Sequence, residues 1–114
     1  MGGMKILCIE DQPETMATLT CMLEGIGYEV TPATSSREAI TLLTKESIAG
    51  VLLEYDLPDG VGTDLRARLK RIRPEIPVLM FAGIGPQTPF MVRFFDAYLR
   101  NGDRLGGGAE DIEP

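Results

Sequence analysis

Four carboxylates near the ends of two apolar segments are the residues best able to do chemistry. Glu10 and Asp11 follow the first apolar run, and Glu54 and Asp56 lie at the end of the run 51–55. Oxygen-rich clusters of this kind suit Mg²⁺ or another hard divalent cation. Single acids commonly cap helices or solvate loops. Acids at the ends of two strands that flank one crevice favour a site instead.

Alternating strands and helices must position these acids. Apolar runs predict strands at 5–9, 28–33, 51–55 and 77–82. Apolar residues at helical spacing predict helices between these strands, and Ser35 and Glu38 have the spacing of a capping box. The alternation implies βαβ units, and hence a parallel sheet with helices on both faces. The four acids then converge at the carboxyl ends of the strands.

Length and composition indicate one globular domain. The chain has 114 residues, of which 44% are hydrophobic and 25% charged, and its net charge is −6. This acidity argues against nucleic acid or an anionic membrane as a partner. The absence of histidine excludes a Ser-His or Cys-His catalytic pair within the chain. Cys8 and Cys21 are expected to be buried free thiols in a cytoplasmic protein.

The chain resembles the receiver domains of response regulators in two-component signalling. The resemblance covers residues 4–102 and rests on five segments in order: 4–11, 27–33, 51–60, 76–82 and 96–102. It implies a flavodoxin-like doubly wound α/β fold with a five-stranded parallel sheet in the order 2-1-3-4-5. The last helix is expected to be missing or replaced by a disordered tail. We therefore expect a receiver-like domain over 1–102 and a flexible tail rich in glycine and acids over 103–114.

Receiver domains of this family accept a phosphoryl group on an aspartate, with Mg²⁺, a hydroxyl and a lysine as helpers. The resemblance places Glu54 at the acceptor position, Ala82 at the hydroxyl position and Asn101 at the lysine position. It implies weak Mg²⁺ binding by Glu10, Asp11 and Asp56. Glu54 reaches one methylene further than aspartate, and about 1 Å of misplacement can cost around 100-fold in rate. Ala82 cannot donate a hydrogen bond, and Asn101 supplies no charge to stabilise the transition state.

We therefore predict a degenerate receiver that is not an enzyme and that acts through contact with a sensor kinase or an output protein. One alternative is residual phosphorylation on Glu54 or Asp56, and another is Glu54 as a constitutive mimic of the phosphorylated state. A third is a small nucleotide-binding or enzymatic domain on the same plan. Against the third, the turn 10–13 lacks the glycines that cradle phosphate.

The end of the chain has two interpretations. Thr88 and Pro89 can start a helix that stops at Asn101-Gly102. The resemblance instead favours a short helix followed by a fifth strand over 97–100, and this is the interpretation we prefer.

Under either interpretation the fifth helix of the family is missing, which leaves one sheet face bare and predicts burial against a second copy of the chain. The expected contributors are aromatic: Phe90, Phe94, Phe95 and Tyr98. The alternative is that Leu105 and Ile112 fold back to cover the gap.

Overall fold

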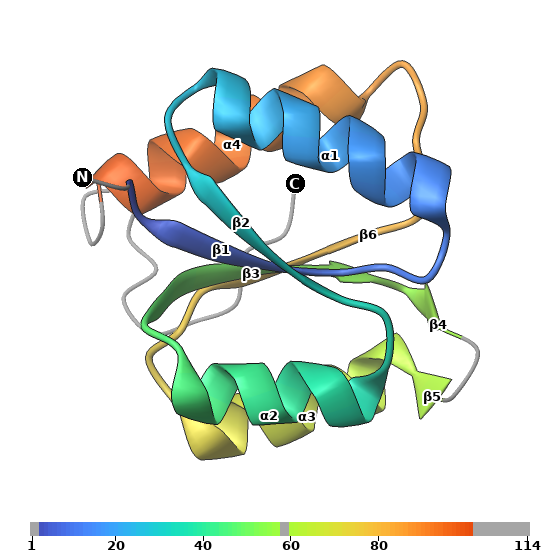
Figure 1. Ribbon diagram of the computed structural model, residues 1–114, viewed down its shortest axis with the longest axis vertical. Helices are drawn as coiled ribbons and strands as arrows, with labels where there is room; N and C mark the ends of the chain where they lie inside the picture. Colours follow the sequence, from blue (N-terminus) through green and yellow to red (C-terminus); the bar gives the residue numbers. More distant parts are fainter. Residues whose placement is uncertain (1–2, 58–59, 102–114) are drawn as a thin grey trace.

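Four parallel strands form the central sheet in the order β2-β1-β3-β6 (Figure 1). The computed structural model describes residues 3–57 and 60–101. The strands of the sheet are β1 Lys5–Ile9, β2 Glu29–Ala33, β3 Ile48–Glu54 and β6 Val78–Phe81. Two short segments, β4 Asp56–Leu57 and β5 Gly60–Val61, form a separate antiparallel pair. The flavodoxin-like α/β fold is confirmed, with the expected order for its first four strands.

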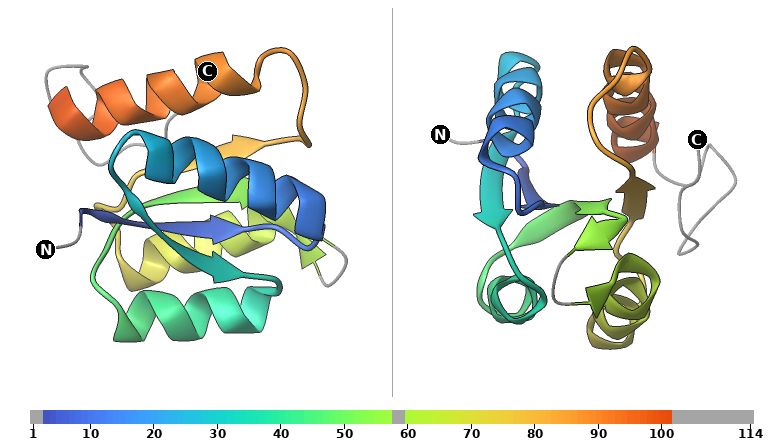
Figure 2. Two further views of the ribbon diagram at one scale, coloured as in Figure 1. Left: turned by 45° about the horizontal axis from the view of Figure 1, so that its top comes forward. Right: turned by 90° about the vertical axis from the view of Figure 1, so that its right-hand side faces the viewer.

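Two helices cover each face of the sheet. The helices are α1 Pro13–Gly25, α2 Ser36–Lys45, α3 Gly62–Ile72 and α4 Thr88–Asn101. Figure 2 shows α1 and α4 on one face and α2 and α3 on the other. Successive residues of β1 alternate between the two cores, because Ile6 and Cys8 pack toward the first pair of helices and Leu7 and Ile9 toward the second. β1 is therefore buried on both sides, as its continuous apolar sequence predicted.

The predicted capping box starts α2. The side-chain oxygen of Ser35 accepts a hydrogen bond from the Glu38 amide at 3.2 Å. The Glu38 carboxylate in turn accepts one from the amide of Thr34 at 2.7 Å. Two amide donors at the start of α2 thus find partners, and helix and strand meet at a fixed point.

The preferred interpretation of 97–100 as a fifth strand is wrong, because these residues lie in α4. The buried side chains of this helix recur at helical spacing: Thr88, Met91, Val92, Phe95 and Tyr98. One apolar stripe of this kind is buried by packing a helix against the sheet. The residue types at 97–99 suit a strand as well as a helix, so only the longer apolar stripe over 88–98 indicates which structure forms.

α4 also covers the sheet face that was expected to be bare. Phe95 is fully buried in the core that α1 and α4 share. A Cβ atom at Gly50 of β3 would lie 2.8 Å from Phe95 Cζ, so glycine at this position lets α4 approach the sheet closely. Because this face is covered, the reason for expecting a second copy of the chain on it no longer holds. Phe90 alone of the four expected aromatic contributors is largely exposed, at 69%.

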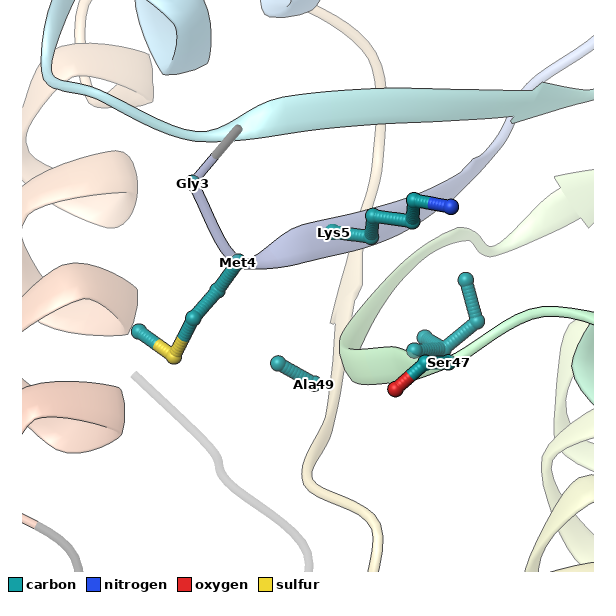
Figure 3. A pocket seen from close by; sticks show the side chains of 6 residues that line it. Gly3, Met4, Lys5, Ser47 and Ala49 are labelled. Carbon is teal, nitrogen blue, oxygen red and sulfur yellow. The ribbon is translucent and has the colours of Figure 1, made fainter. Parts of the chain in front are cut away.

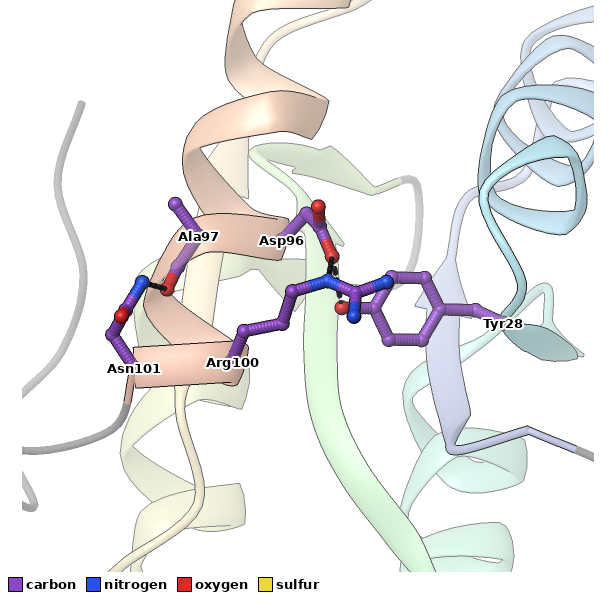
Figure 4. A network of polar contacts seen from close by, with 5 residues as sticks. All are labelled: Tyr28, Asp96, Ala97, Arg100 and Asn101. Atoms are coloured by element: carbon purple, nitrogen blue, oxygen red, sulfur yellow. Dashed lines mark hydrogen bonds and ion pairs between the residues drawn. The ribbon is translucent and has the colours of Figure 1, made fainter.

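A polar network joins α4 to Tyr28, which lies directly before β2 (Figure 4). The Tyr28 hydroxyl donates to Asp96 Oδ1 at 2.5 Å, and Arg100 Nε donates to the same oxygen at 2.7 Å. Burial and the neighbouring Asp96 carboxylate raise the pKa of Tyr28, so its hydroxyl stays a donor. The network thus joins residues 68 positions apart in the sequence and holds the C-terminal half of α4.

Both cysteines are free. Cys8 is buried as expected, and burial raises the pKa of its thiol to about 12. The expectation for Cys21 was wrong, because it lies on the exposed side of α1.

Two further sequence-based expectations concern the end of the chain and membranes. The predicted tail over 103–114, with Leu105 and Ile112, lies outside the described residues. Within 3–57 and 60–101, no helix is long and apolar enough to cross a membrane.

Candidate functional site

The carboxyl ends of β1, β3 and β6 bring Glu10, Glu54 and Gly83 to one crevice. Glu10 follows β1, and Glu54 is the last residue of the adjacent β3. Gly83 follows β6, which pairs with β3 so that Glu54 lies opposite Phe81. Glu10 and Glu54 are only 1% and 6% exposed. The crevice therefore holds two buried carboxyl groups side by side.

Two backbone amides hold the Glu54 carboxylate. Its Oε1 accepts a hydrogen bond from the Gly83 amide at 3.0 Å. Its Oε2 accepts one from the Asp56 amide at 3.2 Å. Gly83 has a positive φ of 66°, a conformation that favours glycine, and it lies in the loop that leads to α4. The extra methylene of glutamate thus serves to bridge β3 and the β6–α4 loop.

Glu10 is a buried carboxyl group with one unsatisfied oxygen. Its Oε2 accepts a hydrogen bond from the Gln12 amide at 2.9 Å, whereas its Oε1 has no partner. Burial raises the pKa of Glu10 to about 7; the Gln12 amide opposes this shift, and the Glu54 carboxyl group adds to it. A proton on Glu10 supplies the donor that its surroundings lack. Glu10 is therefore well placed to share that proton with Glu54.

The other predicted site residues are more exposed than this pair. Asp11 is half-buried and accepts a 3.3 Å hydrogen bond from Gln12 Nε2, and the Asp56 side chain is exposed. Ala82 is exposed, directly before Gly83. Asn101 is the last residue of α4, roughly 20 Å along a 14-residue helix that begins near the crevice. Its side chain donates to the Ala97 carbonyl, so the structure does not bring Asn101 to the site.

One pocket among the described residues adjoins Gly83, and another lies at the opposite edge of the sheet. An apolar pocket of about 230 Å³ adjoins Gly83, with Met80, Ala82 and Met91 among its lining residues. Another of about 230 Å³ lies at the opposite edge of the sheet, around Met4, Lys5 and Ser47 (Figure 3). There Lys5 Nζ forms an exposed ion pair with Glu46 at 2.9 Å.

Comparison with known proteins decides the family. Residues 6–98 match the sequence profile described as the response regulator receiver domain. The chain belongs to this family. It is a receiver domain, which is a signalling domain of two-component systems. The resemblance read from the five segments is thereby confirmed.

Curated relatives of this receiver domain are longer regulatory proteins. The transcriptional regulatory protein TcrA of Mycobacterium tuberculosis is 33% identical over 111 residues, which are 97% of this chain and 40% of TcrA. The response regulator protein PilR of Pseudomonas aeruginosa is 31% identical over 85 residues, 75% of this chain and 19% of PilR. The chain thus spans less than half of either relative.

Solved structures share the fold of this receiver domain. A receiver domain from Clostridium thermocellum has a TM-score of 0.68 and 27% identity, covering 97% of this chain and 82% of that one. A CheY-like receiver domain from Methanospirillum hungatei also has a TM-score of 0.68, at 23% identity, covering 96% of this chain and 80% of that one.

Receiver domains commonly bind Mg²⁺ for phosphorylation, which makes the acids of the crevice its candidate ligands. Among residues 3–57 and 60–101, no group of three or more Asp, Glu, Cys or His side chains is arranged to hold a metal ion. The oxygens of Glu54 already accept two amide hydrogen bonds. Glu10 is buried, and one of its two oxygens accepts the Gln12 amide. The receiver's acids therefore fit a divalent cation poorly.

Reasoning from the sequence missed two contributors to the site. Gly83 was not among the predicted site residues, although a glycine just beyond a strand end can mark a backbone amide that approaches a ligand or side chain closely. The pairing of Glu10 with Glu54 was expected to be repulsive and bridged by a cation. Their burial, which favours a proton instead, cannot be read from residue types alone.

Proposed function

We propose that this receiver domain signals through protein contact in a single, phosphate-independent conformation. The hydrogen bond from the Gly83 amide to the Glu54 carboxylate carries this proposal. It joins the acceptor position at the end of β3 to the loop that leads to α4. A side chain of the protein itself thus holds the crevice in one arrangement. Glu54 thereby acts as a built-in mimic of the phosphorylated state.

The chemistry around Glu54 supports the loss of phosphoryl transfer. Its carboxylate is buried and held by two amides, which restrict the orientation that in-line attack on phosphorus requires. Ala82 offers no hydroxyl, and Asn101 is remote from the crevice. Restoring lysine at position 101 is therefore not expected to repair the site. Asp56 has an exposed carboxylate and is the alternative acceptor.

A divalent cation is expected to bind weakly at most, with Asp11 and Asp56 as its accessible carboxylates. A sensor kinase or an output protein is the proposed partner, as for receiver domains in general. The domain itself supplies a contact surface and performs no reaction. We place it in the cytoplasm, where kinases and regulators of this class meet.

Hydrogen exchange at the Gly83 amide tests the role of Glu54. In Glu54→Ala the amide loses its acceptor, and its exchange is expected to accelerate roughly tenfold or more, because a hydrogen bond to a charged group contributes about 1.5–3 kcal/mol. The control is Asp56→Ala, since Asp56 contributes only its backbone amide to this arrangement. Equal Gly83 exchange in wild type and Glu54→Ala would show that Glu54 does not hold the loop.

A further inference from the structure

β6 is the outer strand of the sheet, and part of its free edge is accessible (Figure 2). The carbonyls of Pro77 and Phe81 accept amide hydrogen bonds from the side of β3. Backbone groups alternate between the two sides of a strand, so those of Met80 and Ala82 point away from β3 and bond to no other described residue. Met80 is half-buried and Ala82 is exposed, whereas Val78 is fully buried. The accessible edge is therefore short and lies at the carboxyl end of β6.

The stretch of chain that contains this edge carries no charge. Residues 76–92 include no Asp, Glu, Lys or Arg, although 25% of the chain is charged. Exposed edge strands are usually protected from pairing by charged side chains, prolines or bulges. Val78–Phe81 has no charge, no proline and no register shift against β3. The strand thus lacks the usual protection against pairing with another chain.

An apolar pocket of about 230 Å³ adjoins the accessible edge. It is lined by residues 80–83 on one side and by Phe90 and Met91 of α4 on the other. The described residues around it are all uncharged, and Phe90 is 69% exposed. The pocket is smaller than the roughly 300–1,000 Å³ of a site for a drug-sized ligand, so it suits a single apolar side chain. Peptides that add a strand to a sheet edge are selected by pockets of this kind.

The carboxyl groups of the crevice lie directly beyond this edge. Gly83, which lines the pocket, donates its amide to Glu54 at 3.0 Å. Asp56 nearby is exposed, and Asp11 is half-buried. A basic side chain at this end of a bound segment would meet complementary charge.

We propose that the edge of β6 at Met80 and Ala82 binds an extended segment of a partner protein, which places an apolar side chain in the adjoining pocket and a lysine or arginine at the acidic crevice. The main chain of the segment pairs with the free backbone groups of β6. This contact rests on the proposed function and deepens it, because it gives the protein contact a surface and a partner chemistry. A second copy of the chain fits less well. Antiparallel pairing of two such edges would bring two acidic crevices together, and like charges across an interface repel.

A designed peptide tests the edge in the full chain. The capped peptide Lys-Val-Thr-Leu-Thr-Val-Lys presents a central leucine and a terminal lysine whichever way it runs. It is expected to shift the amides of Met80, Ala82 and Phe90 and to slow hydrogen exchange at the first two. No shift at millimolar peptide would overturn the proposal. Shifts at Phe90 without slower exchange at Met80 and Ala82 would reduce the contact to the pocket and contradict strand pairing.

Variants of the protein and of the peptide separate the three parts of the contact. Phe90→Ala removes an exposed wall of the pocket and is expected to weaken peptide binding roughly three- to tenfold. The matched control is Ile72→Ala at the end of α3, where the side chain is 38% exposed and remote from the pocket lining. Equal weakening by both would contradict the role of the pocket. A peptide with glutamate in place of both lysines should bind roughly three- to tenfold more weakly at low salt, and equal binding would refute the role of charge.

The protein without peptide gives the last comparison. Shifts at Met80 and Ala82 that grow with protein concentration would assign the edge to a second copy of the chain and overturn the proposal. Gly83 exchange in the free protein tests the proposed function and does not involve the peptide. Failure of peptide binding and failure of the proposed function are therefore distinguishable.

Discussion

Replacing Glu10 with glutamine is expected to stabilise the domain at pH 8 by about 2–3 kcal/mol, because one pKa unit corresponds to about 1.4 kcal/mol. The pKa of Glu10 rises from an ordinary 4.5 to about 7 in the folded protein, mainly through burial. The neutral acid therefore contributes its full stability below about pH 4.5. That contribution is lost as the pH rises through 7, since the ionised group lacks a partner for Oε1.

Denaturant unfolding at pH 5 and pH 8, in the presence of a chelator, measures this effect. The difference between Glu10→Gln and wild type should grow with pH, whereas Glu24→Gln on the exposed side of α1 should stay within about 0.5 kcal/mol of wild type. A destabilised Glu10→Gln at pH 8 would show that Glu10 is ionised and well paired. Added Mg²⁺ gives a second readout, because a true metal ligand would make the cation stabilise wild type but not the variant.

Truncating Phe95 to alanine is expected to cost about 3–5 kcal/mol of unfolding free energy, the usual range for a buried phenylalanine. Phe95 is fully buried, and its ring lies against β3 where Gly50 makes room. Phe90 is on the same helix but 69% exposed, so Phe90→Ala should change stability by no more than about 0.5 kcal/mol. The two substitutions remove the same side chain from one helix, which isolates the effect of burial.

This pair of variants also tests the placement of α4. If residues 97–100 formed a fifth strand, the helix would end near Phe95, and its packing against Gly50 would not exist. Equal effects of the two substitutions, measured by chemical denaturation, would contradict the arrangement described here. A large effect at Phe95 alone agrees with one continuous helix over the sheet.

Local signals in the sequence were enough to predict most of the fold. The run Lys5–Ile9 is apolar throughout and forms a strand buried on both faces. Ser35 accepts the Glu38 amide, as their spacing predicted, and the Glu38 carboxylate accepts the amide of the preceding residue, Thr34. The segment 97–100 was misassigned because Tyr98 and Leu99 suit a strand as well as a helix. Its structure depends on contacts with Gly50 and Tyr28, which are distant in the sequence.

The site was predicted in outline but not in its chemistry. Glu10 and Glu54 do meet at the carboxyl ends of adjacent strands, because the order of strands in a parallel sheet dictates it. Which ligand the carboxyl pair prefers depends on burial, and burial is set by the packing of the whole domain. Asn101 was assigned to the site because 97–100 was expected to form a fifth strand. That segment is helical, so Asn101 lies at the far end of α4.

Intact-mass measurement after incubation with acetyl phosphate and Mg²⁺ tests most directly whether this receiver domain has lost phosphoryl transfer. An unaltered receiver domain treated in parallel shows that the conditions permit phosphorylation. The account predicts that the mass of the wild-type chain stays unchanged, because Glu54 is bound by the Gly83 and Asp56 amides and lacks a hydroxyl or lysine partner. A phosphoryl adduct on a large fraction of molecules, mapped by digestion to Glu54 or Asp56, would contradict it.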